Sequence, residues 1–284
     1  MLAISPAPRS RWTSGRATDS SSSHLIDQIS GRAFRLDSRW VPWRVCWSRT
    51  IPELESLGPT AIAIDIPGHG NRFDEEATMA SRLNAVLDVL QSGDVLVGHS
   101  GGGLEITRAA DAAPELVSHL DYLAAALPLE GHLLQDALIY RDDGGVEGDY
   151  DVTGMLEHLR FNDDGSMAFA DAEGAKQLFY HDCDDETVRW AFEHLTPEIA
   201  GDTATTPISV SRFWEADLPR SFVLCQEDRA QPRWLAEVTA RRLGVQPLTI
   251  MASHSPFLSR PSELAQLLII ATTTTPVGPL RPEG

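Results

Sequence analysis

A glycine-rich segment directly after an apolar run constrains this chain more than any other feature. Residues 95–97 are Val-Leu-Val, the pentapeptide 98–102 is Gly-His-Ser-Gly-Gly, and a helical pattern begins at Leu104. A strand that turns this sharply into a helix needs glycine wherever a Cβ would meet a neighbouring strand or helix. The pattern predicts that Ser100 lies exposed above a sheet, beside a helix N-terminus that could stabilise an oxyanion. The alternative is a glycine-rich turn without chemistry.

Composition limits the class of protein and its partners. The chain has 284 residues, 42% of them hydrophobic, which is enough for one large α/β domain with an insertion. The net charge of -18 argues against nucleic acid and anionic membranes as partners, because both attract basic surfaces. No apolar run approaches the length of a membrane span. The three widely spaced Cys residues form no disulfide framework, so we expect a cytoplasmic protein.

Strand and helix patterns alternate along most of the chain. Alternation of this kind predicts an α/β fold whose mostly parallel sheet is flanked by helices. The expected core comprises residues 38–127 and 208–271. Strands are expected at 61–64, 95–97, 122–126, 221–225 and 248–250, and helices at 74–90, 104–113, 232–243 and 262–270, with a further short helix that has Thr50 as its N-cap.

Three segments fall outside this alternation. Residues 128–207 are acidic, contain helical pieces and show no clear strand, so they predict a helical cap over the carboxyl edge of the sheet. Residues 1–37 are predicted to be a disordered or aberrant N-terminal segment, and 272–284 a disordered tail.

A serine hydroxyl is a weak nucleophile that needs a His base, and the His in turn needs a carboxylate. After a turn of this kind the chain order is serine, acid, histidine, with the last two following later strands. Asp228 follows the expected strand 221–225, and His254 follows 248–250. We therefore predict a triad of Ser100, Asp228 and His254, with the Gly101 N–H as an oxyanion donor. Glu227, beside Asp228, is the rival acid.

Two groups of residues in the expected cap carry weaker signals. Phe179, Tyr180 and Trp190 suggest an apolar or aromatic substrate pocket, although simple packing of the cap explains them equally well. Residues 181–185 (His-Asp-Cys-Asp-Asp) lack the paired spacings of zinc sites, so we expect a solvated loop. The sequence thus predicts no metal and no cofactor.

The motifs together resemble the α/β-hydrolase superfamily, and within it the branch of plant methylesterases, hydroxynitrile lyases and their bacterial esterase relatives. The resemblance spans roughly residues 46–270 and implies an α/β-hydrolase fold with a helical cap. It implies the same assignment: Ser100 as nucleophile, Asp228 as acid and His254 as base. The segments that carry the resemblance are 51–70, 96–102, 225–230 and 254–258.

One departure from the family bears on the reaction. Lyases of this branch carry a Lys immediately after the catalytic His, whereas this chain has Ser255. The resemblance therefore favours an esterase that cleaves a carboxylic ester through an acyl-enzyme. We expect the substrate to be a small-molecule ester, apolar or aromatic if the cap residues line the pocket. The alternatives are hydroxynitrile lyase-like C–C cleavage and a catalytically impaired or non-enzymatic protein of the same fold. A homodimer is compatible with the sequence.

A second departure concerns the first core strand. In the family this strand is an apolar run that ends in His-Gly, whose loop supplies the second oxyanion donor. Residues 30–39 instead contain Arg32, Arg35 and Asp37, which do not suit a strand buried on both faces. Two explanations are open: a divergent strand, or a shifted reading frame before Cys46. A missing strand would favour the impaired alternative.

Resequencing the source DNA separates these explanations. If the frame is shifted over residues 30–45, the restored frame encodes an apolar strand ending in His-Gly just before Cys46. If the sequence is confirmed and the protein hydrolyses esters at an ordinary rate, the frame-shift hypothesis is wrong. Arg39, Trp40 or a nearby backbone N–H must then supply the second donor.

Overall fold

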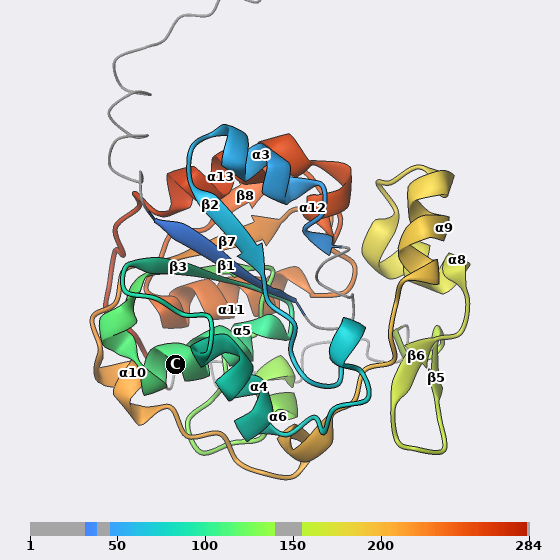
Figure 1. Cartoon of the computed structure of the whole chain (residues 1–284), viewed down its shortest axis with the longest axis horizontal. Coiled ribbons are helices and arrows are strands. Elements are labelled where there is room, and N and C mark those ends of the chain that lie inside the picture. Colours follow the sequence, from blue (N-terminus) through green and yellow to red (C-terminus); the bar gives the residue numbers. More distant parts are fainter. Residues whose placement is uncertain (1–31, 39–45, 140–154, 283–284) are drawn as a thin grey trace, which may run out of the picture.

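The fold is built on one parallel sheet of six strands (Figure 1). The computed structural model describes residues 32–38, 46–139 and 155–282. The strand order is β2-β1-β3-β4-β7-β8, and every neighbouring pair is parallel. The strands are β1 (Ala33–Ser38), β2 (Thr60–Ala63), β3 (Asp94–His99), β4 (Val117–Leu123), β7 (Arg220–Cys225) and β8 (Leu248–Ile250).

Helices cover both faces of the sheet, as Figure 1 shows. One apolar core joins α3 (Thr50–Ser56), α12 (Pro256–Ser259) and α13 (Pro261–Ala271) to one face. The second core lies on the opposite face, so the predicted α/β class with helices on both sides of the sheet is confirmed. Its helices are α4 (Met79–Leu87), α5 (Gly102–Ala112), α10 (Ser211–Glu215) and α11 (Arg233–Leu243), with the short turns η1 (Gly70–Arg72) and η2 (Pro114–Leu116) between elements. Within the described ranges, no helix combines the length and apolar character needed to cross a membrane.

The segment expected as a purely helical cap contains strands as well. Two three-residue strands, β5 and β6, pair antiparallel and form a separate hairpin beside the main sheet (Figure 1). Neither strand was predicted, because each run has only three residues. The cap elements are α6 (Leu134–Ile139), β5 (Leu159–Phe161), β6 (Met167–Phe169), α8 (Ala172–Ala175), the π-helix η3 (Lys176–Tyr180), α9 (Asp185–Glu193) and η4 (Gly201–Ala204).

The N-terminal boundary of the core was predicted wrongly. Residues up to 37 were expected to lie outside it, yet β1 is an interior strand between β2 and β3. Phe34 and Leu36 are fully buried in the core beneath α3 and α13. Arg35 is also buried, and its Nε donates to the Asp94 carboxylate at 2.6 Å. A paired charge can occupy such a position because its partner offsets part of the lost hydration.

The C-terminal segment was also predicted wrongly, because residues through Pro282 pack against the core. The N–H groups of Val277 and Gly278 both donate to the carbonyl of Gly244, at the end of α11. The guanidinium of Arg242 donates to the Pro282 carbonyl at 3.0 Å. The simple composition of this segment suggested disorder. Its order depends on hydrogen bonds to partners that are distant in the sequence.

Two helix starts differ from expectation. Thr50 is the first residue of α3, not its N-cap, and its hydroxyl donates to the Phe257 carbonyl at 3.2 Å. Helix α4 begins at Met79, where Thr78 and Ser81 form a reciprocal capping box. The acidic residues before Thr78, included in the expected helix 74–90, form turns instead.

Two titratable groups lie fully buried side by side in the middle of the sheet. Asp121 and His119 both belong to β4, and His119 Nε2 lies 2.9 Å from the hydroxyl of Ser221 on β7. Burial raises the pKa of Asp121 to about 7 and lowers the pKa of His119 to about 4, because the interior disfavours either charge. The neutral form of Asp121 therefore contributes its full share to the free energy of unfolding below its ordinary pKa of 3.8. This contribution is lost as the pH rises through about 7. His119 acts oppositely: its contribution is complete above 6.5 and is lost as the pH falls through about 4.

Replacing Asp121 by Asn should remove the first of these two effects. We expect Asp121→Asn to be more stable than the natural chain, by a margin that grows as the pH rises from about 4 to about 7 and then levels. Urea unfolding across this pH range measures the margin, which should reach about 1 kcal/mol or more. The exposed Asp88→Asn serves as the control and should show no such growth. A margin independent of pH would contradict the prediction.

Candidate active site

The turn at Ser100 joins β3 to α5 through a strained backbone. Ser100 has a φ of 55°, in the left-handed region that residues other than glycine seldom adopt. A Cβ on Gly98 would lie 2.7 Å from the Gly102 carbonyl oxygen, and one on Gly102 would lie 3.1 Å from the Asp37 carbonyl of β1. The glycines on both sides of Ser100 are therefore needed for close approach, to the helix in one case and to the neighbouring strand in the other.

Gly101 is the N-cap of α5, directly after Ser100. The first N–H groups of a helix have no partner within the helix and can stabilise a negative charge. Gly101 and Ser100 both line one cavity, so the predicted oxyanion donor lies beside the predicted nucleophile. Arg39 and Trp40, the candidates for a second donor, lie outside the described residues.

His254 and Asp228 are in direct contact. The Nδ1 of His254 lies 2.7 Å from Oδ2 of Asp228, and these side chains are 3% and 6% exposed. The other Asp228 oxygen accepts from the N–H groups of Ala230 and Gln231, each at 2.8 Å. A carboxylate held by these three donors fixes the His ring with Nδ1–H toward the acid, which leaves Nε2 able to accept a proton. Glu227 is exposed and does not supply the carboxylate that His254 contacts.

A second histidine, His99, contacts the backbone and the ring of His254. His99 Nε2 donates to the backbone carbonyl of His254 at 2.8 Å, and the two ring centroids lie 4.7 Å apart. Full burial, with the charge of His254 as a smaller cause, lowers the pKa of His99 well below its usual range. His99 therefore stays neutral and keeps its proton on Nε2 for this bond. The sequence placed His99 in the turn but gave no sign of this contact.

The cap holds the loops that carry Asp228 and His254. The Ser253 hydroxyl donates to the Phe179 carbonyl at 2.8 Å, and the Ser253 N–H donates to the Asp182 carboxylate at 3.0 Å. His181 Nε2 lies 2.8 Å from the carbonyl of Glu227. The end of η3 and the two residues after it thus contact both loops.

The remaining acids of segment 181–185 have separate roles. Asp184 caps α9 through the Thr187 N–H, and Asp185 pairs with Lys176. Within the described part of the chain, no three His, Cys, Asp or Glu side chains gather closely enough to hold a metal ion.

One cavity of about 280 Å³ contains both Ser100 and His254 in its wall. Core and cap both contribute to it, and most of the wall is apolar. A larger hollow of about 530 Å³ lies between α10 and the C-terminal segment, but it includes no member of the predicted triad. We therefore take the smaller cavity as the candidate active site. Its apolar wall includes Leu134, Leu138, Leu159, Met167 and Leu235.

Of the three predicted pocket residues, the structure brings one to this cavity. Phe179 is part of the wall, and its ring centroid lies 4.9 Å from that of His254. Tyr180 is fully buried against the edge of Phe179, and Trp190 packs on His194; neither belongs to the wall. Consecutive residues of a helix point in different directions, so Phe179 and Tyr180 cannot face the same space.

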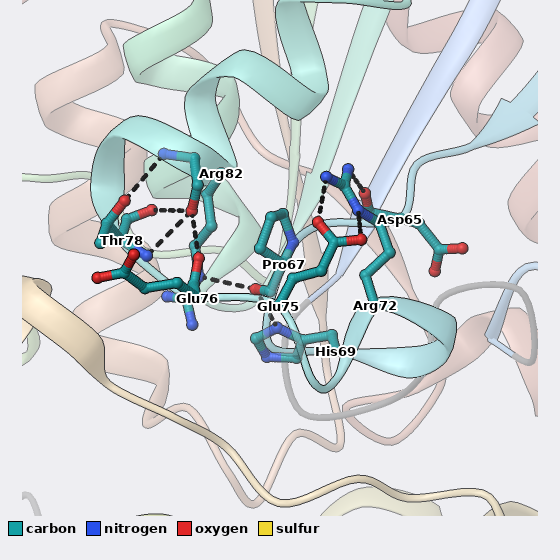
Figure 2. Close-up of polar contacts among 9 residues, drawn as sticks. Asp65, Pro67, His69, Arg72, Glu75, Glu76, Thr78 and Arg82 are labelled. Atoms are coloured by element: carbon teal, nitrogen blue, oxygen red, sulfur yellow. Dashed lines mark hydrogen bonds and ion pairs between the residues drawn. The ribbon is translucent and has the colours of Figure 1, made fainter.

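The loop after β2 contacts a further polar group of the cavity wall. Figure 2 shows this loop held by Arg72, which donates to the Asp65 carbonyl, and by Arg82, which donates to the Pro67 carbonyl. From this loop, His69 Nε2 contacts the carboxylate of Glu198 at 2.7 Å, and Glu198 lies in the cavity wall. The sequence analysis did not single out Glu198, because a lone acid in an acidic segment carries no signal.

Comparisons with known proteins agree with this architecture. A model described as "Alpha/beta hydrolase family" matches residues 31–267. Norfluorocurarine synthase 2 from a Strychnos species is 25% identical over 241 residues, covering 80% of this chain and 90% of the relative. The pyrethroid hydrolase of Sphingobium wenxiniae is 24% identical over 261 residues, covering 84% of this chain and 90% of the relative. A solved pyrethroid hydrolase from Sphingobium faniae shares the fold, with a TM-score of 0.72 at 22% identity over 85% of this chain and 97% of that one. Putative methylesterase 12 of Arabidopsis thaliana is 22% identical over 237 residues, covering 79% of this chain and 67% of the relative.

The tight turn at Ser100 can be tested with one methyl group. Gly98→Ala forces its Cβ against the backbone of Gly102, so we expect a loss of about 1 to 3 kcal/mol in the free energy of unfolding. Gly278→Ala is the matched control, because its nearest neighbour is the Gly244 Cα at 3.9 Å. Urea unfolding compares the two variants with the natural chain. Equal stability of Gly98→Ala and Gly278→Ala would contradict the prediction.

Proposed function

The chain belongs to the alpha/beta hydrolase family, and we propose that it is a serine esterase that cleaves a small carboxylic ester through an acyl-enzyme. The observation that carries this proposal is the contact between Asp228 and His254, because His254 lines the same cavity as Ser100 of the strained turn. Distant homologues that are esterases support it. The apolar cavity wall favours an ester with an apolar or aromatic group.

In the proposed reaction, Ser100 Oγ attacks the ester carbonyl as His254 Nε2 takes its proton. The N–H of Gly101 donates to the oxyanion of the tetrahedral intermediate. The intermediate collapses, the alcohol leaves with the proton from His254, and the acyl group stays on Ser100. Water, deprotonated by His254, then attacks the acyl-enzyme, and the acid product leaves. Asp228 orients His254 and stabilises its positive charge in both halves.

The two alternatives have less support. Lyase-like cleavage would need a charged group for the released cyanide, and the position where lyases have Lys holds Ser255, which is not part of the cavity wall. An impaired scaffold was suggested by the absence of a first core strand. β1 is formed and paired on both edges, which removes this reason. The second reason for the impaired alternative was the missing His-Gly motif, and the candidates for the donor it would supply, Arg39 and Trp40, lie outside the described residues.

Active-site labelling tests the proposal directly. A fluorophosphonate probe should label the natural chain at Ser100 and should not label Ser100→Ala. Turnover of a p-nitrophenyl ester should fall at least about a thousandfold in Ser100→Ala, Asp228→Asn and His254→Ala, and the three losses should not add, because the residues act as a unit. Circular dichroism should show that each variant remains folded.

Glu227→Gln is the matched control for the acid, because Glu227 is adjacent but exposed. It should keep most of the turnover. An inactive Glu227→Gln beside an active Asp228→Asn would overturn the assignment of the acid. No labelling of the natural chain would overturn the esterase proposal as a whole.

A further inference from the structure

Among the described residues, two that are not glycine have a left-handed backbone, and both belong to the candidate active site. Ser100 has a φ of 55° and Ala124 a φ of 42°. Ser100 follows β3, Ala124 follows the neighbouring strand β4, and both line the cavity. Backbone strain of this kind persists only where the surroundings hold it, and it concentrates at functional sites. The turn that presents the nucleophile accounts for the strain at Ser100, whereas no step of the proposed reaction uses Ala124.

The backbone of Ser100 is hydrogen-bonded to residues on both sides of Ala124. The Ser100 N–H donates to the Leu123 carbonyl at 3.2 Å, and the Ala126 N–H donates to the Ser100 carbonyl at 2.9 Å. The Gly103 N–H, in the first turn of α5, donates to the same carbonyl at 3.2 Å. Both polar backbone groups of the proposed nucleophile are thus bound to the turn that follows β4.

The bend at Ala124 allows these two bonds to form together. The Ala124 N–H still donates to the Val223 carbonyl of β7 at 2.9 Å, so the chain leaves the sheet at the dihedral angles of Ala124 itself. Three residues of continued strand would span about 10 Å. Such a strand would carry the Ala126 N–H past Ser100, while the Leu123 carbonyl stayed beside it. The observed bend, with its positive φ, keeps both groups at Ser100.

The turn after β4 is packed tightly and presents these groups from a fixed position. Ala125 is fully buried, and Ala124 and Ala126 are 3% and 6% exposed. A Cβ placed on Gly103 of α5 would lie 3.1 Å from the Ala125 Cβ. On the other side, Nε2 of Gln231 donates to the Ala125 carbonyl at 3.5 Å. Contacts with α5 and with the segment before α11 therefore hold the turn in place.

Resting on the esterase function proposed above, we propose that Ala124 is a positioning residue for the nucleophile. Its left-handed conformation sets where the Leu123 carbonyl and the Ala126 N–H lie. These groups in turn hold the Ser100 backbone in its own strained conformation. A residue that resists a positive φ at this position displaces one or both groups, and the Ser100 hydroxyl then moves relative to His254. We expect the effect in the reaction of Ser100 and not in ester binding, because small misplacements of reacting groups slow the chemical step.

Two variants of similar size separate the backbone of Ala124 from the space that its side chain takes in the cavity. Asn adopts a positive φ readily, whereas the β-branched Thr seldom does. At saturating fluorophosphonate, we expect Ala124→Thr to be labelled at least about tenfold more slowly than Ala124→Asn. The kcat for a p-nitrophenyl ester should show the same difference, with similar KM values in the two variants.

The same two substitutions at Ala80 are the matched control. Ala80 is exposed on α4, and Thr and Asn have similar helix propensities, so Ala80→Thr and Ala80→Asn should be labelled at similar rates. Equal labelling rates of Ala124→Thr and Ala124→Asn would overturn the proposal. A difference confined to KM would overturn it as well, because it would show that the side chain acts on binding.

Hydrogen exchange of the Ala126 amide keeps the test independent of catalysis. In protein labelled with ¹⁵N-alanine, this amide should exchange at least about tenfold faster in Ala124→Thr than in Ala124→Asn, because its bond to Ser100 is lost. The Ala236 amide, which donates to the Pro232 carbonyl at the start of α11, is the internal reference and should exchange alike in both. This result supports the positioning role even if the natural chain is not labelled, an outcome that counts against the esterase function alone. Equal exchange of the Ala126 amide in the two variants would overturn the positioning role.

Ala124→Gly tests the strain itself and covers the case in which Ala124→Thr does not fold. Gly adopts a positive φ without strain, so we expect Ala124→Gly to unfold at a higher urea concentration than the natural chain. Its Ala126 amide should remain protected, because the turn persists. A lower unfolding midpoint in Ala124→Gly, or loss of protection at Ala126, would overturn the proposal.

Discussion

The close approach of β3, α5 and β1 around Ser100 is the constraint on which the rest of the site depends. Only two residues separate the end of β3 from the start of α5, which is possible because Gly98 and Gly102 carry no side chain. The Ser100 backbone adopts a left-handed conformation as a result. This conformation costs about 1 to 3 kcal/mol, which contacts in the surrounding sheet must offset. In return, its side chain is placed at the sheet edge beside the first N–H groups of α5.

The same close approach explains why a polar segment forms an interior strand. The carbonyl of Asp37 on β1 is the group nearest to a Cβ placed on Gly102, so the turn is shaped against this strand. Phe34 and Leu36 supply the apolar face that β1 requires. The charge of Arg35 would forbid the position if it stood alone, but Asp94 of β3 lies beside it. Composition indicated a defect here because the compensating charge is distant in sequence.

The sequence predicted features that depend on local patterns. Continuous apolar runs located β3 and β7, and the rule that catalytic groups follow strand ends directed attention to Asp228 and His254, which are in contact in the structure. Features that depend on distant partners were missed. The β5–β6 hairpin and the segment ending at Pro282 have weak intrinsic preferences and derive their order from contacts across the fold. Glu198 belongs to this second group, because only the folded structure places it against His69 and in the cavity wall.

The cap is joined to the reaction machinery rather than placed over it as a separate cover. Ser253, which precedes His254, is bonded to the cap through both its hydroxyl and its N–H, and the Glu227 carbonyl beside Asp228 is bonded to His181. Glu198 ties the opposite side of the cap to His69 in the core. A motion that lifted the cap as a rigid body would break these contacts and would disturb the orientation of His254 itself. The position of His254 therefore depends on the contacts between cap and core.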